Sequence, residues 1–346
     1  MANTEVPGIT ETAVSRNKDQ ILITLATGKT GYLTTKNLLQ DGYSVKIFVR
    51  SKSDKANELQ RLGAEVIVGT FDNINDIKRA LTGVSTVYYC YPLKRGMVDD
   101  VKLFIKAALA SGIKAVVFMG QRIAEFADTG SVLTNNTREA YNLFQESGLN
   151  VVYFIPGYFA DNNFPVTEFV LQLGIFPSSY GKGKNPWISN EDMGRTIAAL
   201  LKNPVPYFGT KLFPTGSKSI SAVEMANIFT KVRGSKVRVI ESPEWLFLKA
   251  GFMLGKEFGV DAFAIVQANL YNRQLKMNRF DIEPTGVVKE LTGREPEDFE
   301  TITRRYFDES PYKKRSLKNW LSAFNKFLFM PFTPIPSTRA LAELNA

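Results

Sequence analysis

Short apolar runs alternate with amphipathic stretches from residue 20 to residue 162, and no other feature constrains the fold as much. The runs are rich in β-branched and aromatic residues, as strands are, whereas the stretches between them carry apolar residues at helical spacing. Strands are expected at 21–24, 45–50, 65–68, 86–91, 115–119 and 151–155. Because these strands are apolar on both faces and alternate with helices, the sequence predicts an α/β protein with a doubly wound parallel Rossmann sheet.

The pattern loosens after residue 163, where prolines divide the chain into shorter pieces. Ser221 and Glu224 have the spacing of a capping box, which predicts that a helix starts there. We therefore expect a smaller mixed α/β region that binds the substrate. The expected parts are a polar N-terminal segment at 1–19, a dinucleotide-binding domain at 20–162, a substrate-binding region at 163–310 and a basic amphipathic tail at 311–346.

The chain has no histidine and one cysteine, Cys90. This composition excludes a disulfide framework, cysteine-clustered metal sites and the Ser-His and Cys-His nucleophile systems. No metal site is expected. Any proton chemistry has to use carboxylates, tyrosine, lysine, the cofactor or water.

The net charge of +9 is concentrated at the C-terminal end, where residues 311–346 hold six basic residues and one acid. The rest of the chain carries only a small positive excess, so a nucleic-acid partner is not expected. Residues 1–20 lack the apolar core of a leader peptide, and no apolar run approaches the roughly 18 residues of a membrane span. These features predict a cytoplasmic protein.

A glycine-containing turn follows the first expected strand and leads into a helix. Gly28 and Gly31 hold the last two positions of a GxxGxxG turn, which aims backbone N–H groups and the positive helix end at a pyrophosphate. A P-loop is excluded because Ile23 stands where that motif needs glycine. An ordinary turn between strand and helix is the alternative. The predicted phosphate-binding residues are Thr27, Gly28, Lys29, Thr30 and Gly31.

The second expected strand ends in basic residues. Arg50 is followed by Ser51, Lys52 and Lys55, and the acidic residue that usually holds the ribose 2′-hydroxyl of NAD is missing. Basic side chains suit a 2′-phosphate, so the predicted cofactor is NADP(H). The alternative is a solvated basic loop without a ligand.

Several short motifs together resemble the NmrA-like branch of the atypical short-chain dehydrogenases. They occur at 26–31, 69–73, 91–92, 155–162, 187–194 and 215–221, and the resemblance covers about residues 20–307. Its Gly-Lys-Thr turn is also similar to that of ergot-alkaloid iminium reductases in this branch. One departure is Leu25, which stands where the family has glycine and would be strained at a positive φ.

The resemblance implies roles for particular residues and an unusual chemistry. Phe71 and Asp72 would flank the adenine, and Tyr91 and Pro92 would approach the nicotinamide ribose. In ordinary short-chain dehydrogenases a serine, a tyrosine and a lysine protonate the carbonyl oxygen. Here the serine position reads Met119-Gly120-Gln121-Arg122, and the lysine position falls at Arg138. Arginine does not donate protons near neutral pH.

Two Tyr-x-x-x-Lys matches, Tyr180/Lys184 and Tyr207/Lys211, lie in proline- and glycine-rich sequence, so we interpret them as chance or structural matches. We therefore expect an oxidoreductase that acts on a hydrophobic small molecule, an imine, iminium or nitrogen heterocycle of alkaloid-type metabolism. The alternatives are an NADP-bound cyclase or isomerase, with or without coupled redox chemistry, and a non-catalytic NADP-sensing regulator.

The candidate active-site residues follow the fifth and sixth expected strands. Core packing is the alternative role for each aromatic residue among them. The nearby acids Glu125 and Asp128 are read as solvated loop charges. The candidates are Arg122, Arg138, Tyr141 and Tyr158 for catalysis, and Tyr91, Gln121, Phe159 and Asn162 for the substrate pocket.

The tail contains one apolar stripe at helical spacing, formed by Leu317, Trp320, Leu321, Phe324 and Leu328. Basic amphipathic helices of this kind lie on membranes or bind partners. The favoured reading is a helix packed on the substrate-binding region with its basic groups in solvent.

Overall fold

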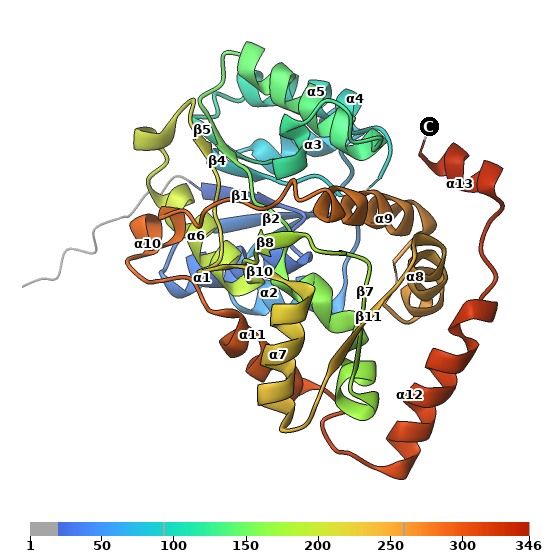
Figure 1. Ribbon diagram of the computed structural model, residues 1–346. Coiled ribbons are helices and arrows are strands. Elements are labelled where there is room, and N and C mark those ends of the chain that lie inside the picture. The colour runs from blue at the N-terminus through green and yellow to red at the C-terminus, as the bar shows by residue number, and fades with distance from the viewer. Residues whose placement is uncertain (1–19, 93, 259, 346) are drawn as a thin grey trace, which may run out of the picture.

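The computed structural model describes residues 20–92, 94–258 and 260–345. A seven-stranded parallel sheet forms the centre, in the order β3-β2-β1-β4-β5-β6-β9 (Figure 1). The strand order reverses between β1 and β4, where a doubly wound sheet opens a crevice. The predicted parallel Rossmann sheet is confirmed. Its strands are β1 (Gln20–Thr24), β2 (Val45–Val49), β3 (Glu65–Val68), β4 (Val84–Tyr89), β5 (Ala115–Met119), β6 (Val151–Phe154) and β9 (Lys211–Leu212).

Helices cover both faces of the sheet (Figure 1). On one face, α3 (Ile74–Leu81), α4 (Met97–Ala110) and α5 (Val132–Glu146) bury apolar side chains such as Phe104 and Phe144. On the other face, α1 (Lys29–Gln40), α2 (Asp54–Arg61) and α6 (Asn190–Lys202) bury Leu38 and Ile197, among others. The near-continuous apolar runs of the strands are explained by these two covered faces.

The sheet continues beyond residue 162, the expected end of the dinucleotide-binding domain. Strand β9 pairs with β6, and α6 packs against α1. The two helices approach closely at Gly194, where an added Cβ would lie only 2.5 Å from the Cβ of Leu33. Residues from the expected substrate-binding region therefore complete the sheet and cover one of its faces.

The remainder of residues 163–310 forms two small sheets and further helices around a second aromatic core. Ser221 and Glu224 form the predicted capping box at the start of α7. The elements are η2 (Ala160–Val166), η3 (Phe169–Leu173), β7 (Ile175–Ser178), β8 (Lys184–Pro186), η4 (Val205–Tyr207), β10 (Ser219–Ser221), α7 (Ala222–Arg233), β11 (Arg238–Glu241), α8 (Glu244–Phe258), α9 (Ala262–Lys276), α10 (Val287–Thr292) and α11 (Phe299–Glu309).

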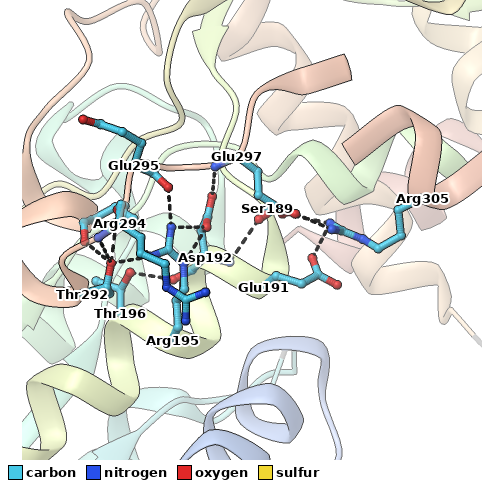
Figure 2. A network of polar contacts seen from close by, with 11 residues as sticks. Ser189, Glu191, Asp192, Arg195, Thr196, Thr292, Arg294, Glu295, Glu297 and Arg305 are labelled. Carbon is cyan, nitrogen blue, oxygen red and sulfur yellow. Dashed lines mark hydrogen bonds and ion pairs between the residues drawn. The ribbon is translucent and has the colours of Figure 1, made fainter. Parts of the chain in front are cut away.

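A polar network around the buried Asp192 fixes the N-terminal end of α6 against the segment that leads into α11, as Figure 2 shows. The Asp192 carboxylate accepts hydrogen bonds from Arg195 Nε and from the backbone N–H of Glu297, both at 2.8 Å. Burial raises the pKa of Asp192. Arg305 of α11 forms ion pairs with Glu191 at 2.6 Å and with Glu297 at 2.5 Å. The second region is thereby joined to the sheet domain by charged contacts.

The tail forms α12 (Leu317–Phe329), η5 (Met330–Phe332) and α13 (Thr338–Leu344), which run along the outside of the molecule beside α8 (Figure 1). As expected, α12 packs on the second region, where it contacts η3, but Lys326, one of the basic groups expected in solvent, binds a buried carboxylate of the protein. The apolar stripe does not make this contact, however, and its side chains are exposed. Glu168 decides the orientation, because its buried carboxylate binds Ser322 and Lys326 on the other side of the helix.

Candidate functional site

The turn between β1 and α1 is tightly folded on itself. Gly28 donates its N–H to the Leu25 carbonyl oxygen at 2.9 Å. A Cβ at Gly31 would lie 2.5 Å from that same oxygen, so the position admits only glycine. Leu25 has a φ of 50°, so the leucine occupies the left-handed backbone conformation in which a side chain is strained.

The N-terminal end of α1 has no side-chain cap. Its N-cap residue is Gly28, and its first turn holds no acidic residue. Ser, Asn or Asp side chains cap α2, α3, α5, α6, α7, α9, α11, α12 and α13. The backbone N–H groups of residues 29–31 consequently have no acceptor within the described chain. Such donors at the positive end of a helix fit a dinucleotide pyrophosphate.

Lys29 is exposed at this end of α1. Desolvation lowers the pKa of Lys29, and the nearby Asp161 carboxylate opposes that shift. Asp161 is buried and accepts hydrogen bonds from the N–H of Asn190, at 2.9 Å, and from the Tyr306 hydroxyl. Burial, reinforced by Asp161, raises the pKa of Tyr306. Asp161 and Tyr306 were not predicted as site residues, although Asp161 lies in the 155–162 motif.

The basic loop after β2 lies next to α1. Lys55 Nζ is 5.5 Å from the centre of the Tyr32 ring on α1. Arg50, Ser51 and Lys52 are exposed, and Arg50 makes no hydrogen bond or ion pair with the described residues. A guanidinium at the carboxyl end of β2 that has no partner among the described residues can bind a 2′-phosphate.

A cavity of about 210 Å³ gathers several predicted residues between the ends of β5 and β6, α5 and η1 (Arg122–Glu125). Gln121, Arg138 and Tyr141 line it, together with Glu125 and Lys211. Lys211 Nζ lies 3.1 Å from Glu125 Oε1 and 4.6 Å from the centre of the Tyr141 ring. Glu125 is therefore not the solvated loop charge that we expected. The Tyr207/Lys211 match is interpreted as chance or structural, and the Tyr207 hydroxyl donates to Glu290 at 3.0 Å.

The two predicted catalytic arginines differ in their contacts. Arg138 Nε donates to the Ala124 carbonyl oxygen at 2.9 Å, and its guanidinium also binds the Phe126 carbonyl, so it holds η1 against α5. The Arg122 guanidinium lies 5.0 Å from the centre of the Phe213 ring, and its Nε is buried without an acceptor in the described structure. Arg122 follows β5 and Phe213 follows β9, so this contact lies at the carboxyl edge of the sheet.

A family model described as the NmrA-like family matches residues 17–301. The chain belongs to this family. A curated relative, NAD(P)H azoreductase from Xenophilus azovorans, is 28% identical over 64% of this chain and 76% of its own length. Agroclavine dehydrogenase from Claviceps fusiformis is 25% identical over 81% of this chain and 94% of its own. The NADPH complex of an Escherichia coli NADPH-dependent quinone oxidoreductase is 19% identical, with a TM-score of 0.70 over 83% of this chain and 99% of that one.

The residues that the NmrA-like resemblance assigned to the cofactor differ in accessibility. Phe71 is buried, with its ring 5.3 Å from Phe48 and 5.6 Å from Tyr91. Asp72 is exposed just after β3, and Pro92 is half-buried after β4. The Tyr91 hydroxyl donates to Asp100 Oδ2 at 2.6 Å, and burial together with Asp100 raises the pKa of Tyr91. The Tyr91 hydroxyl proton is therefore already donated in a hydrogen bond within this NmrA-like chain.

The Tyr158 hydroxyl likewise forms a hydrogen bond within the protein. Its hydroxyl donates to Asn272 Oδ1 at 3.1 Å, and its ring stacks on Phe280 at 5.8 Å. Burial raises the pKa of Tyr158. Phe159 forms a backbone bridge with Ile188, and Asn162 lies in η2. The structure therefore brings Gln121, Arg138 and Tyr141 together but places Tyr158 in the aromatic core of the second region.

Leu25→Gly is expected to leave NADPH affinity unchanged or higher, because glycine adopts the positive φ without strain. Leu25→Ala is the matched control, since it removes the same packing but keeps the Cβ. We expect the Gly variant to exceed the Ala variant in unfolding free energy by about 1 kcal/mol. Urea unfolding and calorimetric titration measure the two effects. A clear loss of NADPH affinity in Leu25→Gly would show that the leucine side chain is part of the binding site.

Proposed function

We propose that this NmrA-like chain is an NADP(H)-dependent oxidoreductase that acts on a hydrophobic small molecule. The observation that carries the proposal is the uncapped N-terminal end of α1, where the N–H groups of residues 29–31 have no acceptor in the described chain. The unpaired Arg50 supports the choice of NADP(H) over NAD(H). The relatives named as NAD(P)H azoreductase and agroclavine dehydrogenase support redox chemistry.

Bound NADPH would supply a hydride. The residues of this chain would hold the cofactor at three points: the N–H groups of Lys29 to Gly31 on the pyrophosphate, Arg50 and Lys55 on the 2′-phosphate, and Asp72 at the adenosine end. Lys29, near Asp161, would add positive charge near the phosphates. Positioning and electrostatics are then the main contributions of the protein.

The proposed acceptor is a carbon–nitrogen double bond, in a cyclic imine, an iminium ion or a related nitrogen heterocycle. An iminium ion accepts the hydride at carbon while the π electrons become the nitrogen lone pair. A neutral imine first takes a proton from solvent on its nitrogen and then reacts in the same way, so no proton has to reach an oxygen atom. This chemistry suits a site in which Tyr91 and Tyr158 already donate to Asp100 and Asn272. It also suits Arg138, which is bound to backbone carbonyls.

A second candidate acceptor is favoured by Arg122. Its buried Nε has no partner among the described residues, and a guanidinium stabilises negative charge that develops on a quinone-like acceptor. Arg122→Gln separates the two candidates. If the acceptor is quinone-like, this variant loses activity in the quinone assay; if it is an iminium, the variant retains iminium reduction, because the cationic ground state gains nothing from a second cation.

NADPH oxidation with a cyclic imine, a quinone and a simple ketone tests the proposal. We expect the ketone to react at least about a hundredfold more slowly than the imine, since general acid catalysis contributes 10²–10⁴-fold. Lys184→Met and Lys211→Met are each expected to leave imine turnover within about fivefold. Efficient ketone reduction that collapses in either variant contradicts the proposal, because it would reveal a proton relay through that lysine.

A further inference from the structure

The tail presents an apolar surface that the described structure leaves uncovered. We call it the outward face of α12. Its core is Leu317, Leu321, Phe324 and Leu328, whose spacing places them in one row along the helix. Trp320 extends the row, with its ring stacked on Phe324 at 5.0 Å. These side chains, with Phe329 and Phe332 after them, are between 40% and 75% exposed.

The opposite side of α12 is fixed to the protein. Ala323 is fully buried, and Phe327 packs against Phe169. Ser322 Oγ and Lys326 Nζ donate to the buried carboxylate of Glu168 at 2.9 and 2.8 Å. A rotation of α12 that buried the outward face would leave this carboxylate without partners, which is strongly unfavourable. The outward face is therefore held away from the body of the molecule.

Positive charge adjoins the outward face. Lys314 and Lys318 are exposed and form no ion pair with the described residues, and Arg315 donates to Ser235 Oγ at 2.7 Å. Lys313 is paired with Asp308 at 2.8 Å. The sequence contains no acidic residue between positions 310 and 342. A shallow hollow lined by Gln172, Arg315, Leu317 and Trp320 lies at the same end of α12.

We propose that the outward face of α12 docks on an anionic lipid surface. The apolar row would lie at the boundary between headgroups and acyl chains, and Lys314 and Lys318 would contact lipid phosphates. Charge complementarity selects this occupant over α12 of a second copy, because residues 310–342 of a copy offer no acidic residue to the basic end of α12. None of the described helices is long and apolar enough to cross a bilayer, so the contact is peripheral. The proposal does not depend on the proposed function.

Co-sedimentation of the full chain with vesicles tests this proposal. We expect binding to vesicles that contain phosphatidylglycerol, at least about tenfold weaker binding to pure phosphatidylcholine, and a loss of binding as salt is added. The double variants Leu321→Ser/Phe324→Ser and Lys314→Gln/Lys318→Gln should each weaken partitioning at least about tenfold. The matched controls are Val205→Ser/Val223→Ser, which alters exposed apolar residues elsewhere, and Lys106→Gln/Lys182→Gln, which removes the same charge.

NADPH titration of each variant reports whether the protein remains folded, and we expect affinities within about threefold of the original. Equal binding to neutral and anionic vesicles, or vesicle binding unaffected by both tail variants, overturns the proposal. So does a lipid-free dimer, measured by light scattering, that dissociates in Leu321→Ser/Phe324→Ser, because the face would then be covered by a second copy.

Discussion

NADPH is expected to bind at least tenfold more tightly than NADH, and Arg50→Ala is expected to remove most of that preference. Arg50 lies at the carboxyl end of β2, exposed and without a partner in the described chain, and no acidic residue stands beside it to hold a ribose 2′-hydroxyl. A hydrogen bond to a charged group contributes about 1.5–3 kcal/mol, which corresponds to a factor of about ten to a hundred in affinity.

Calorimetric titration of both cofactors measures this preference. Arg238→Ala is the matched control, because Arg238 is an exposed arginine on β11, in the second region of the fold. We expect the control to keep the full preference for NADPH. Equal affinities of the original protein for NADPH and NADH, or an unchanged preference in Arg50→Ala, would refute the assignment of Arg50 to the 2′-phosphate.

Gly31→Ala is expected to lower NADPH affinity at least about a hundredfold. The new Cβ would lie 2.5 Å from the Leu25 carbonyl oxygen and 3.0 Å from the Ala26 Cα, both backbone atoms, so the turn itself has to move. That movement misaligns the N–H groups at the start of α1, and each lost contact to a phosphate is worth about 1.5–3 kcal/mol. Overpacking also reduces stability by about 1–3 kcal/mol.

Gly286→Ala is the control, because nothing lies within 4 Å of a Cβ at Gly286. Thermal unfolding without cofactor shows how much of each variant is folded, and titration of the folded protein then isolates the binding effect. We expect Gly286→Ala to match the original protein in both measurements. If Gly31→Ala binds NADPH normally, the pyrophosphate does not use this turn.

Much of the sheet domain could be predicted from local sequence. Strand and helix periods differ, so the alternation after residue 20 specified a parallel sheet with two covered faces. The glycine spacing located the turn at α1, and the comparison with the family identified Leu25 as the unusual residue of that turn, where the structure has a positive φ. These features depend on residues close together in the chain, where steric rules act directly.

The side chains around the candidate site could not be placed in the same way. Tyr158 lies in the 155–162 motif that follows the sixth strand. Its hydroxyl nevertheless donates to Asn272, which is 114 residues further along the chain. Lys211 meets Glu125 and Tyr141 only because β9 adds to the edge of the sheet beside β6. Sequence motifs indicate which residues lie near a strand end, but the partner of each side chain depends on elements that are distant in sequence.

The tail shows most clearly what local sequence determines and what only the tertiary structure determines. The sequence by itself determined that residues 317–328 form an amphipathic helix, because helical spacing decides which side chains share a face. The tertiary structure decided which face is covered. Glu168, a buried acid far from the tail in sequence, binds Ser322 and Lys326, and a rotated α12 would leave this carboxylate unpaired, which is unfavourable. The side of α12 that carries Ser322, Ala323, Lys326 and Phe327 therefore faces the protein, and the row from Leu317 to Leu328 faces outward.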